Sequence, residues 1–162
     1  MKLVYYPDSR LHTPCKPIVD DEPERIRDLG QQMLEFMKAA GGVGLAANQV
    51  GLDIRLLVLD SGNRPEIFVN PVLLSGTGEK VLMGEGCLSL PDFRRQVKRY
   101  TEIMVQHVDL DHGHTVFESI EGFRAHILQH EVEHLDGVMF IDHLGMVVQE
   151  QARKHMKKRN RK

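Results

Sequence analysis

The sequence predicts an α+β domain in which mainly antiparallel β-sheet packs around a central helix. Three observations predict this class: strand-like segments fill the middle of the chain, helical patterns occupy both ends, and one further helical pattern follows the strands at about 122–135. A chain of 162 residues can bury one core, and no repeat or linker divides it. We therefore expect a single domain over residues 1–162, ending in a basic helix and tail at about 146–162.

The first forty residues are expected to form extended structure followed by one amphipathic helix. Prolines punctuate the first twenty residues and leave room for one helical turn at about Ser9–His12. Three acids and Pro23 then mark a helix start, because acids favour the positive end of the helix dipole and proline fits the first turn. The helix should end near Gly41. Its apolar stripe comprises Ile26, Leu29, Met33, Leu34 and Met37.

The next segments are expected to be strands separated by turns and loops. Ile54–Asp60 is an apolar run typical of a buried strand, a turn is expected at 61–65, and 67–74 continues as strand. Four glycines interrupt the pattern between 76 and 86, so we expect broken structure there. A rigid loop bounded by glycine and proline should follow at Glu85–Pro91.

Two later strands are expected to form a hairpin. Gln96–Val108 alternates weakly, and Thr115–Ile120 follows it after a turn at 109–114 that contains Asp and Gly. This turn also holds His112 and His114. The requirements of a tight turn account for its composition, so we do not assign these histidines as metal ligands.

The stretch Gln129–Gly137 carries the pattern H-E-x-x-H and organises the prediction of function. In a helix, His130 and His134 stand one turn apart on the same face, where both imidazoles can reach one metal ion. Glu131 lies between them, in a position to handle a proton of water rather than to bind the metal. The pattern therefore predicts a hydrolytic metal site.

The helical repeat predicts which residues of this helix face inward. Both histidines fall on an apolar stripe, where a shared metal ion would satisfy their nitrogens. Gln129, Glu133 and Asp136 are expected on the opposite side, facing solvent. His126 precedes the first motif histidine by one turn, but the motif glutamate lies inside the later pair, so we expect His126 at the helix surface or at a pocket rim. The stripe comprises Phe123, Ile127, His130, His134 and Val138.

An open catalytic site needs a third protein ligand. In one class of zinc proteases the third ligand is a histidine that follows the motif, but Phe140 occupies that position here. In another class the third ligand is a downstream glutamate, and Glu150 is the acid in question here. Cys87 is the better candidate, because its thiolate would complete a Cys-His-His set with the fourth position open to water. Two rival hypotheses remain: a metal-dependent endopeptidase, and a non-enzymatic module whose structural zinc is closed by Cys15.

A second unusual stretch, Gly42–Gly51, contains the pattern G-x-G-x-x-A. A dinucleotide site would need a strand before this pattern and a helix after it, whereas here a helix precedes it. We expect the glycines to let the backbone approach a bound chain closely, with Gln49 as a single polar group in an apolar setting.

Three segments together resemble the signature segments of the peptide deformylase family. Gly42–Gly51, Glu85–Ser89 and Gln129–Gly137 are similar, in the same order, to G-x-G-x-A-A-x-Q, E-G-C-L-S and Q-H-E-x-D-H. The resemblance covers essentially the whole chain. It implies an α+β hydrolase that removes the formyl group from the N-terminal formyl-methionine of nascent chains.

The resemblance implies a role for each residue of the metal site. Cys87, His130 and His134 would bind one divalent metal ion, and Glu131 would be the catalytic acid and base. Thiolate and imidazole ligands admit iron, zinc, nickel or cobalt. The resemblance favours Fe²⁺ as the native ion, with Zn²⁺, Ni²⁺ or Co²⁺ as replacements.

The resemblance also implies how an N-formylmethionyl peptide would be held. Gln49 and the backbone N–H of Leu88 would form the oxyanion hole. Gly44 would hold the peptide backbone by strand-like pairing. The other substrate-binding residues would be Gly42, Val43, Phe123, Ile127 and Arg99.

Two positions depart from the family pattern. Glu133 stands where the family has the shorter Asp, and we expect this to alter the packing around the site without abolishing activity. His126 stands where relatives carry Arg or an aliphatic residue near the pocket, which puts the family's peptide preference in question for this chain.

Charge is distributed unevenly along the chain. The net charge is −2, yet seven of the 21 Lys and Arg residues lie in the last ten residues, which contain no acid. A basic tail on an acidic body suggests a polyanionic partner, and the ribosome is the expected one. A solvated chain end is the alternative. No sequence-specific binding of nucleic acid is expected.

The composition indicates a cytoplasmic protein. No stretch approaches the ~20 apolar residues of a membrane span, so we expect no membrane association, and the N-terminus lacks a secretory signal. The two cysteines, Cys15 and Cys87, form no disulfide framework, as is usual in a reducing compartment. A bacterial cytoplasm is expected, and an organelle remains open.

Overall fold

The computed structural model describes residues 1–62 and 64–159 of the chain. The expected turn at 61–65 includes residue 63, and the expected tail includes 160–162, so those parts of both predictions lie outside the described residues. The α+β class predicted above is confirmed. The helices are η1 (Ser9–His12), α1 (Pro23–Ala39), η2 (Ala47–Val50), α2 (Gly122–Leu135), η3 (Phe140–His143) and α3 (Met146–Arg159).

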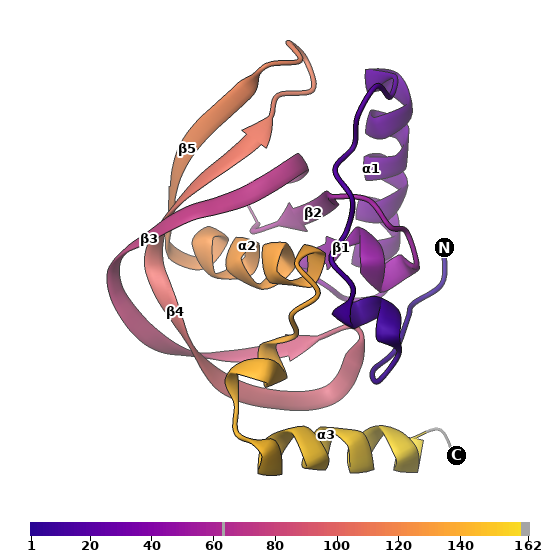
Figure 1. The fold of residues 1–162 in the computed structure, drawn as a ribbon, viewed down its shortest axis with the longest axis vertical. Helices are drawn as coiled ribbons and strands as arrows, with labels where there is room; N and C mark the ends of the chain where they lie inside the picture. The colour runs from indigo at the N-terminus through magenta and orange to yellow at the C-terminus, as the bar shows by residue number, and fades with distance from the viewer. Residues whose placement is uncertain (63, 160–162) are drawn as a thin grey trace.

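One sheet of five strands forms the framework, in the spatial order β1-β2-β3-β4-β5, with every neighbouring pair antiparallel. The two longest strands, β3 and β4, curve strongly and wrap around α2, which lies at the centre of the molecule (Figure 1). The short strand β1 forms one edge of the sheet. The strands are β1 (Gly44–Ala46), β2 (Leu56–Asp60), β3 (Pro65–Cys87), β4 (Leu90–Val108) and β5 (Thr115–Glu121).

The prediction of broken structure between residues 76 and 86 was wrong, because β3 runs without interruption to Cys87. The glycines serve the strand in two ways. A side chain on Gly76 would collide with the ring of Tyr100 on β4, and Gly78 adopts a φ of +70° beside a shift in register. Glycine in a strand commonly marks such bulges and close approaches.

The loop expected at Glu85–Pro91 is instead a tight hairpin. Cys87 pairs with Leu90 across the sheet, so only Leu88 and Ser89 form the turn between β3 and β4. The sulfur of Cys87 is therefore held at the end of a long, paired strand, which restricts its position more than a loop would.

Helix α2 is buried on nearly all sides, because the curved sheet encloses it. The prediction that Gln129 faces solvent was wrong: its side chain is buried, accepts a hydrogen bond from the backbone N–H of Tyr100 and donates one to the Tyr100 carbonyl. His126, expected at the surface or a rim, is also buried. Phe123, expected to face inward, is 51% exposed. A helix enclosed by protein loses the clear two-sided pattern of a surface helix.

The buried apolar residues form two clusters. The larger cluster joins α1 and α2 to the sheet and includes Met33, Leu57 and Leu128. The smaller one joins the N-terminal segment, the start of β4 and α3, and includes Leu11 and Met156. Helix α3 therefore packs against β4 (Figure 1).

Candidate metal centre and active site

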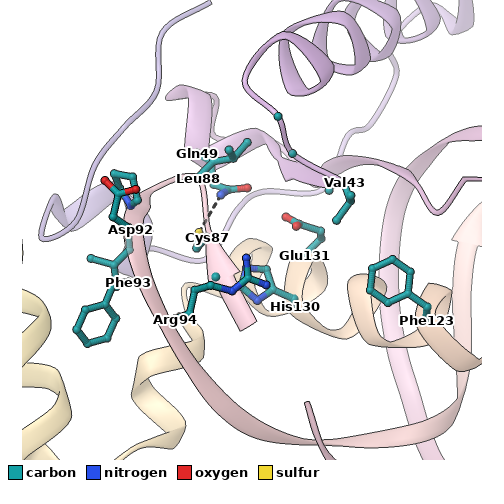
Figure 2. Close-up of a pocket in the computed structure, with 16 residues that line it drawn as sticks. Val43, Gln49, Cys87, Leu88, Asp92, Phe93, Arg94, Phe123, His130 and Glu131 are labelled. Atoms are coloured by element: carbon teal, nitrogen blue, oxygen red, sulfur yellow. Dashed lines mark hydrogen bonds between the residues drawn. The ribbon is translucent and has the colours of Figure 1, made fainter. Parts of the chain in front are cut away.

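A cavity of about 500 Å³ opens between β1 and the β3–β4 hairpin, above α2. Figure 2 shows its two walls, with Val43 and Phe123 on one side and Asp92 and Arg94 on the other. Glu131 lies between these walls. The lining comprises Gly41, Gly42, Val43, Gly44, Gln49, Gly86, Cys87, Leu88, Leu90, Pro91, Asp92, Phe93, Arg94, Phe123, His130 and Glu131.

Three potential metal ligands converge beside the cavity, which two of them, Cys87 and His130, line. One ligand atom from each of Cys87, His130 and His134 lies within 4.8 Å of the other two, although the thiol comes from the end of β3 and the imidazoles come from α2. The Cys87 sulfur lies 3.1 Å from Nε2 of His134. Cys15, considered above as a fourth ligand, is a free cysteine outside this cluster.

A buried carboxylate orients the first histidine of the cluster. Nδ1 of His130 lies 2.7 Å from Oε2 of Glu85, so this nitrogen donates its proton to the carboxylate and leaves the Nε2 lone pair free for a metal. Burial opposes ionisation of Glu85, but hydrogen bonds from His130 and Arg99 outweigh it and lower the Glu85 pKa to about 2. Glu85 is thus an anion that fixes the tautomer of His130.

The same carboxylate is the inner end of a buried ionic network. Arg99, which is 3% exposed, donates to both oxygens of Glu85 over 2.6 and 3.1 Å and also to Glu133. Glu133, expected to face solvent, therefore turns toward Arg99. Its second oxygen lies 2.9 Å from Nε2 of His143 in η3. The sequence analysis assigned no role to Glu85 or His143. Glu85 is identified by its contact with a candidate ligand histidine, and His143 by its contact with Glu133.

Glu131 projects into the cavity beside the ligand cluster. Its side chain is buried, and none of the described residues supplies a hydrogen bond to its Oε2. Burial raises the pKa of Glu131 to about 7, and the negative charge of Glu85 acts in the same direction, against the opposing effect of His130. A carboxyl group with such a pKa is suited to accept and release a proton near neutral pH.

The side-chain amide of Gln49 is held in one orientation beside Cys87. Its Oε1 accepts a hydrogen bond from the backbone N–H of Ala46 at 2.7 Å, so the amide nitrogen must point into the site. That nitrogen donates to the Cys87 sulfur at 3.2 Å (Figure 2). It also lies 3.3 Å from Oγ of Ser89. Gln49 thus presents N–H groups beside the thiol.

The N-terminal segment connects the two segments that carry Gln49 and Ser89. The backbone N–H of Val4 donates to the carbonyl of Gln49 at 2.8 Å, and that of Tyr6 donates to the carbonyl of Ser89 at 2.9 Å. Residues 4–6 therefore form a strap between η2 and the β3–β4 turn. Both side chains at its ends are buried, which anchors the strap in the core.

The residues expected to contact substrate do not all lie in the cavity. Gly42, Val43, Gly44 and Phe123 line it, as do the candidate catalytic groups Gln49, Leu88 and Glu131. Ile127 and Arg99 lie outside the lining: Ile127 is buried in the larger apolar cluster, and Arg99 is buried in the ionic network described above.

Residues 1–150 match the family model described as polypeptide deformylase. The chain belongs to this family. The peptide deformylase of Rhodopseudomonas palustris strain BisB5 is 38% identical over 151 residues, which cover 89% of this chain and 85% of the relative. The peptide deformylase of Psychrobacter cryohalolentis is 37% identical over 161 residues, which cover 98% of this chain and 86% of the relative.

Solved structures of peptide deformylases share the fold. The structure from Ehrlichia chaffeensis superposes with a TM-score of 0.90 at 32% identity, covering 99% of this chain and 97% of the other. The structure from Legionella pneumophila superposes with a TM-score of 0.88 at 36% identity, covering 99% and 95%. The predicted function is confirmed at this level: the chain is a hydrolase of the metal-dependent deformylase family, which removes the formyl group from nascent polypeptides.

Proposed function

We propose that this chain hydrolyses the formamide of N-formylmethionyl peptides at a divalent metal ion held by Cys87, His130 and His134. The convergence of these three ligand atoms within 4.8 Å is the observation that carries the proposal. The donor set fits the ion, because one thiolate and two imidazoles leave a fourth position for the reaction. Fe²⁺ is the proposed native ion, and Zn²⁺, Ni²⁺ or Co²⁺ would bind the same donors. Burial lowers the pKa of His134, which keeps that ligand neutral.

Glu131 is the proposed proton carrier of the reaction. The cation, when bound, supplies Lewis-acid chemistry that polarises the formyl group and lowers the pKa of water. Oε2 of Glu131, which has no hydrogen-bond partner among the described residues, accepts the proton of the attacking water and passes it to the leaving amine. A nearby cation favours the carboxylate form, so the group begins the cycle as a base.

Gln49 and the backbone N–H of Leu88 are proposed to stabilise the charge that develops on the formyl oxygen. Ala46 fixes the Gln49 amide, and the hairpin turn fixes Leu88, so neither donor has to reorganise during the reaction. Such a donor contributes roughly 3 kcal/mol to the stability of the transition state.

The free edge of β1 is proposed to bind the peptide as an added strand. Gly44 lies at this edge and lines the cavity, so its backbone can pair with an extended chain. Val43 and Phe123, which are 47% and 51% exposed in the absence of peptide, would cover the methionine side chain together with Gly42. Ile127 would support this pocket from beneath, and Arg99 would act through the ionic network.

Hydrolysis of formyl-Met-Ala-Ser by the metal-loaded protein, compared with a peptide cleavable only at an internal bond, tests the proposal. We expect deformylation without internal cleavage. In Glu131→Gln, kcat should fall by about 10²–10⁴, the usual contribution of acid–base catalysis, while metal and peptide still bind. Near-normal kcat in this variant would show that Glu131 is not the proton carrier. Cleavage of the internal bond would favour an endopeptidase.

We further propose that α3 and the tail associate with the ribosome in a bacterial cytoplasm. Lys157 and Lys158 in the last turn of α3 are exposed and form no ion pair within the described residues, whereas the neighbouring Arg159 pairs with Asp92 of β4 at 2.8 Å. Such a surface suits a polyanionic partner. None of the helices in the described part of the chain combines the length and apolar character needed to cross a membrane.

Charge reversal tests the tail more cleanly than truncation, because truncation would remove the buried Met156. Lys157→Glu with Lys158→Glu should weaken cosedimentation with ribosomes and leave hydrolysis of a short formyl peptide unchanged. Reversal of Lys2 and Lys98, two exposed cations outside α3 that form no ion pair within the described residues, is the matched control and should change neither. Equal ribosome binding by both double variants would show that the tail is a solvated chain end without a role in this binding.

A further inference from the structure

A continuous chain of polar contacts runs from the surface to the proposed metal centre. Nε2 of His143 donates to Glu133, and Glu133 accepts a further hydrogen bond from Arg99. Arg99 donates hydrogen bonds to both oxygens of Glu85, and Glu85 accepts a further hydrogen bond from Nδ1 of His130. Every link in this chain is a hydrogen bond to an ionised group, the stronger class of hydrogen bond.

His143 is the outermost and most exposed member of this network. Its side chain is 41% exposed, whereas those of Arg99 and Glu85 are 3% and 2% exposed. It stands at the end of η3, the short helix that follows α2, so its position is tied to the ligand helix by a few residues of chain. None of the roles proposed above for catalysis or substrate binding involves it.

The charges of the network explain why it needs an outer partner. Two carboxylates, whose side chains are 2% and 19% exposed in Glu85 and Glu133, share one guanidinium, so the three groups together carry an excess of one negative charge. Burial of an unpaired charge is costly, and a donor on each free carboxylate oxygen reduces that cost. His143 supplies this donor to Oε2 of Glu133, while Oε1 remains bound to Arg99. His126 lies 3.6 Å from Glu85 on the inner side.

We propose that His143 is a positioning residue for the metal centre. By holding Glu133 it fixes the guanidinium of Arg99, which in turn holds Glu85 against Nδ1 of His130 and aims Nε2 at the cation. This role rests on the ligand set proposed above. Partners that orient a ligand histidine from outside commonly contribute 10–100-fold to metal affinity.

Cobalt binding to the apoprotein tests the proposal without any measurement of activity. Co²⁺ affinity is measured by competition with a chelating dye, and the visible spectrum of the complex reports the geometry of its ligands. His143→Phe removes the donor and keeps a planar ring, whereas His143→Gln restores an N–H donor. His112→Phe is the matched control, because His112 is an exposed imidazole that lies 3.1 Å from a carboxylate oxygen of Asp109, on the β4–β5 turn.

In His143→Phe we expect about tenfold weaker Co²⁺ binding and a changed spectrum. His143→Gln should recover most of the affinity, and His112→Phe should match the wild type. The apoprotein Tm should change by no more than about 4 °C, the scale of a modest surface change in a domain of this size. Wild-type affinity and spectrum in His143→Phe, or an equal loss in His112→Phe, would overturn the proposal.

A double-variant cycle checks that His143 acts through Glu133. Glu133→Gln alone should weaken Co²⁺ binding, and adding His143→Phe should weaken it little further. Additive losses would overturn the proposed route. If His143→Phe does not fold, His143→Asn takes its place in the cycle, because its shorter amide also leaves Glu133 without the donor.

The wild-type titration separates this proposal from the one on which it rests. If wild-type apoprotein binds Co²⁺ without a thiolate-to-metal absorption band, or if Cys87→Ala binds it equally well, the ligand set itself is wrong. If the wild type shows the band and His143→Phe is indistinguishable from it, only the role of His143 is refuted.

Discussion

Gly44 packs so closely against Glu131 that a methyl group in its place would overlap the carboxylate. The glycine therefore sets how far the proton-carrying side chain can extend toward β1. Such contacts matter because a displacement of about 1 Å in a catalytic group can cost about 10² in rate. Gly44, proposed above to pair with the substrate backbone, thus also limits the position of Glu131, the proposed proton carrier.

We predict that Gly44→Ala lowers kcat at least tenfold while Co²⁺ affinity stays within the wild-type range. The three atoms nearest to the added methyl all belong to Glu131, so we expect it to displace that side chain, and the two measurements separate catalysis from metal binding. Gly84→Ala is the control, since a methyl there would meet no atom within 4 Å. Unchanged kcat in Gly44→Ala would show that Glu131 has room to move.

The two thiols are expected to differ sharply in reactivity. Burial raises the pKa of Cys15 to about 11, and the charge of Asp53 adds to this effect, so at pH 8 only about one thiol in a thousand is ionised. Cys87 lines the open cavity. We predict that an alkylating reagent at pH 8 modifies Cys87 alone in the native apoprotein, and that bound metal protects it.

Mass spectrometry of the alkylated protein identifies the modified residue. Cys15→Ser should leave the stoichiometry unchanged, and Cys87→Ser should abolish the reaction. Modification of Cys15 at a comparable rate in the folded protein would contradict its burial, and a reaction of Cys87 that is insensitive to metal would contradict its assignment as a ligand.

At the scale of elements, the strap at residues 4–6 joins the two segments that carry the proposed oxyanion donors. We predict that Val4→Pro lowers kcat about tenfold, because proline lacks the N–H that holds the carbonyl of Gln49. This is less than the 10²–10³ expected for removal of an oxyanion donor itself, because Ala46 still orients the Gln49 amide. Steady-state kinetics on a formyl peptide, together with the Co²⁺ affinity, provide the measurement.

Tyr5→Pro is the control for the strap. Tyr5 is 41% exposed, and neither strap hydrogen bond uses its N–H, so this variant keeps both bonds. If both proline variants lose equal activity, the effect comes from stiffening the segment and not from the bond to Gln49.

The elements that sequence reasoning placed correctly are those whose signal is local. Helix α1 begins at Pro23 and ends before Gly41, as the dipole and the glycines predicted. The continuity of β3 was missed because its glycines are required by a partner strand: Gly76 makes room for a Tyr100 that is distant in sequence. Likewise Gln129 is buried because it bonds the backbone of β4, which no helical periodicity encodes.

The site divides in the same way. The H-E-x-x-H spacing predicts that His130 and His134 share one face, since one helix carries both. The place of Glu85 beside His130 depends on how the end of β3 meets α2, across 45 positions of sequence. The pairing of His143 with Glu133 depends on the path of η3. These contacts are tertiary, so the sequence contains the residues but does not indicate which of them contact one another.

For the molecule as a whole, the proposed metal is a cross-link between parts that pack in different clusters. Cys87 ends β3 beside the smaller cluster, while α2 belongs to the larger one. An ion that binds only the folded arrangement shifts the folding equilibrium toward it by mass action. The stability of the fold and the occupancy of the site are therefore linked.

We predict that metal raises the Tm of the wild type well above that of the apoprotein. Ion at about 1,000 times its Kd contributes about 4 kcal/mol, which corresponds to roughly 8–16 °C for a domain of this size. Calorimetry of the apoprotein with and without Co²⁺ measures the shift. Cys87→Ala should lose most of it, because two imidazoles alone hold the ion weakly, whereas Cys15→Ser should keep it. If metal raises the Tm of Cys87→Ala as much as that of the wild type, the ion does not cross-link β3 to α2, and the proposed origin of the link between occupancy and stability is wrong.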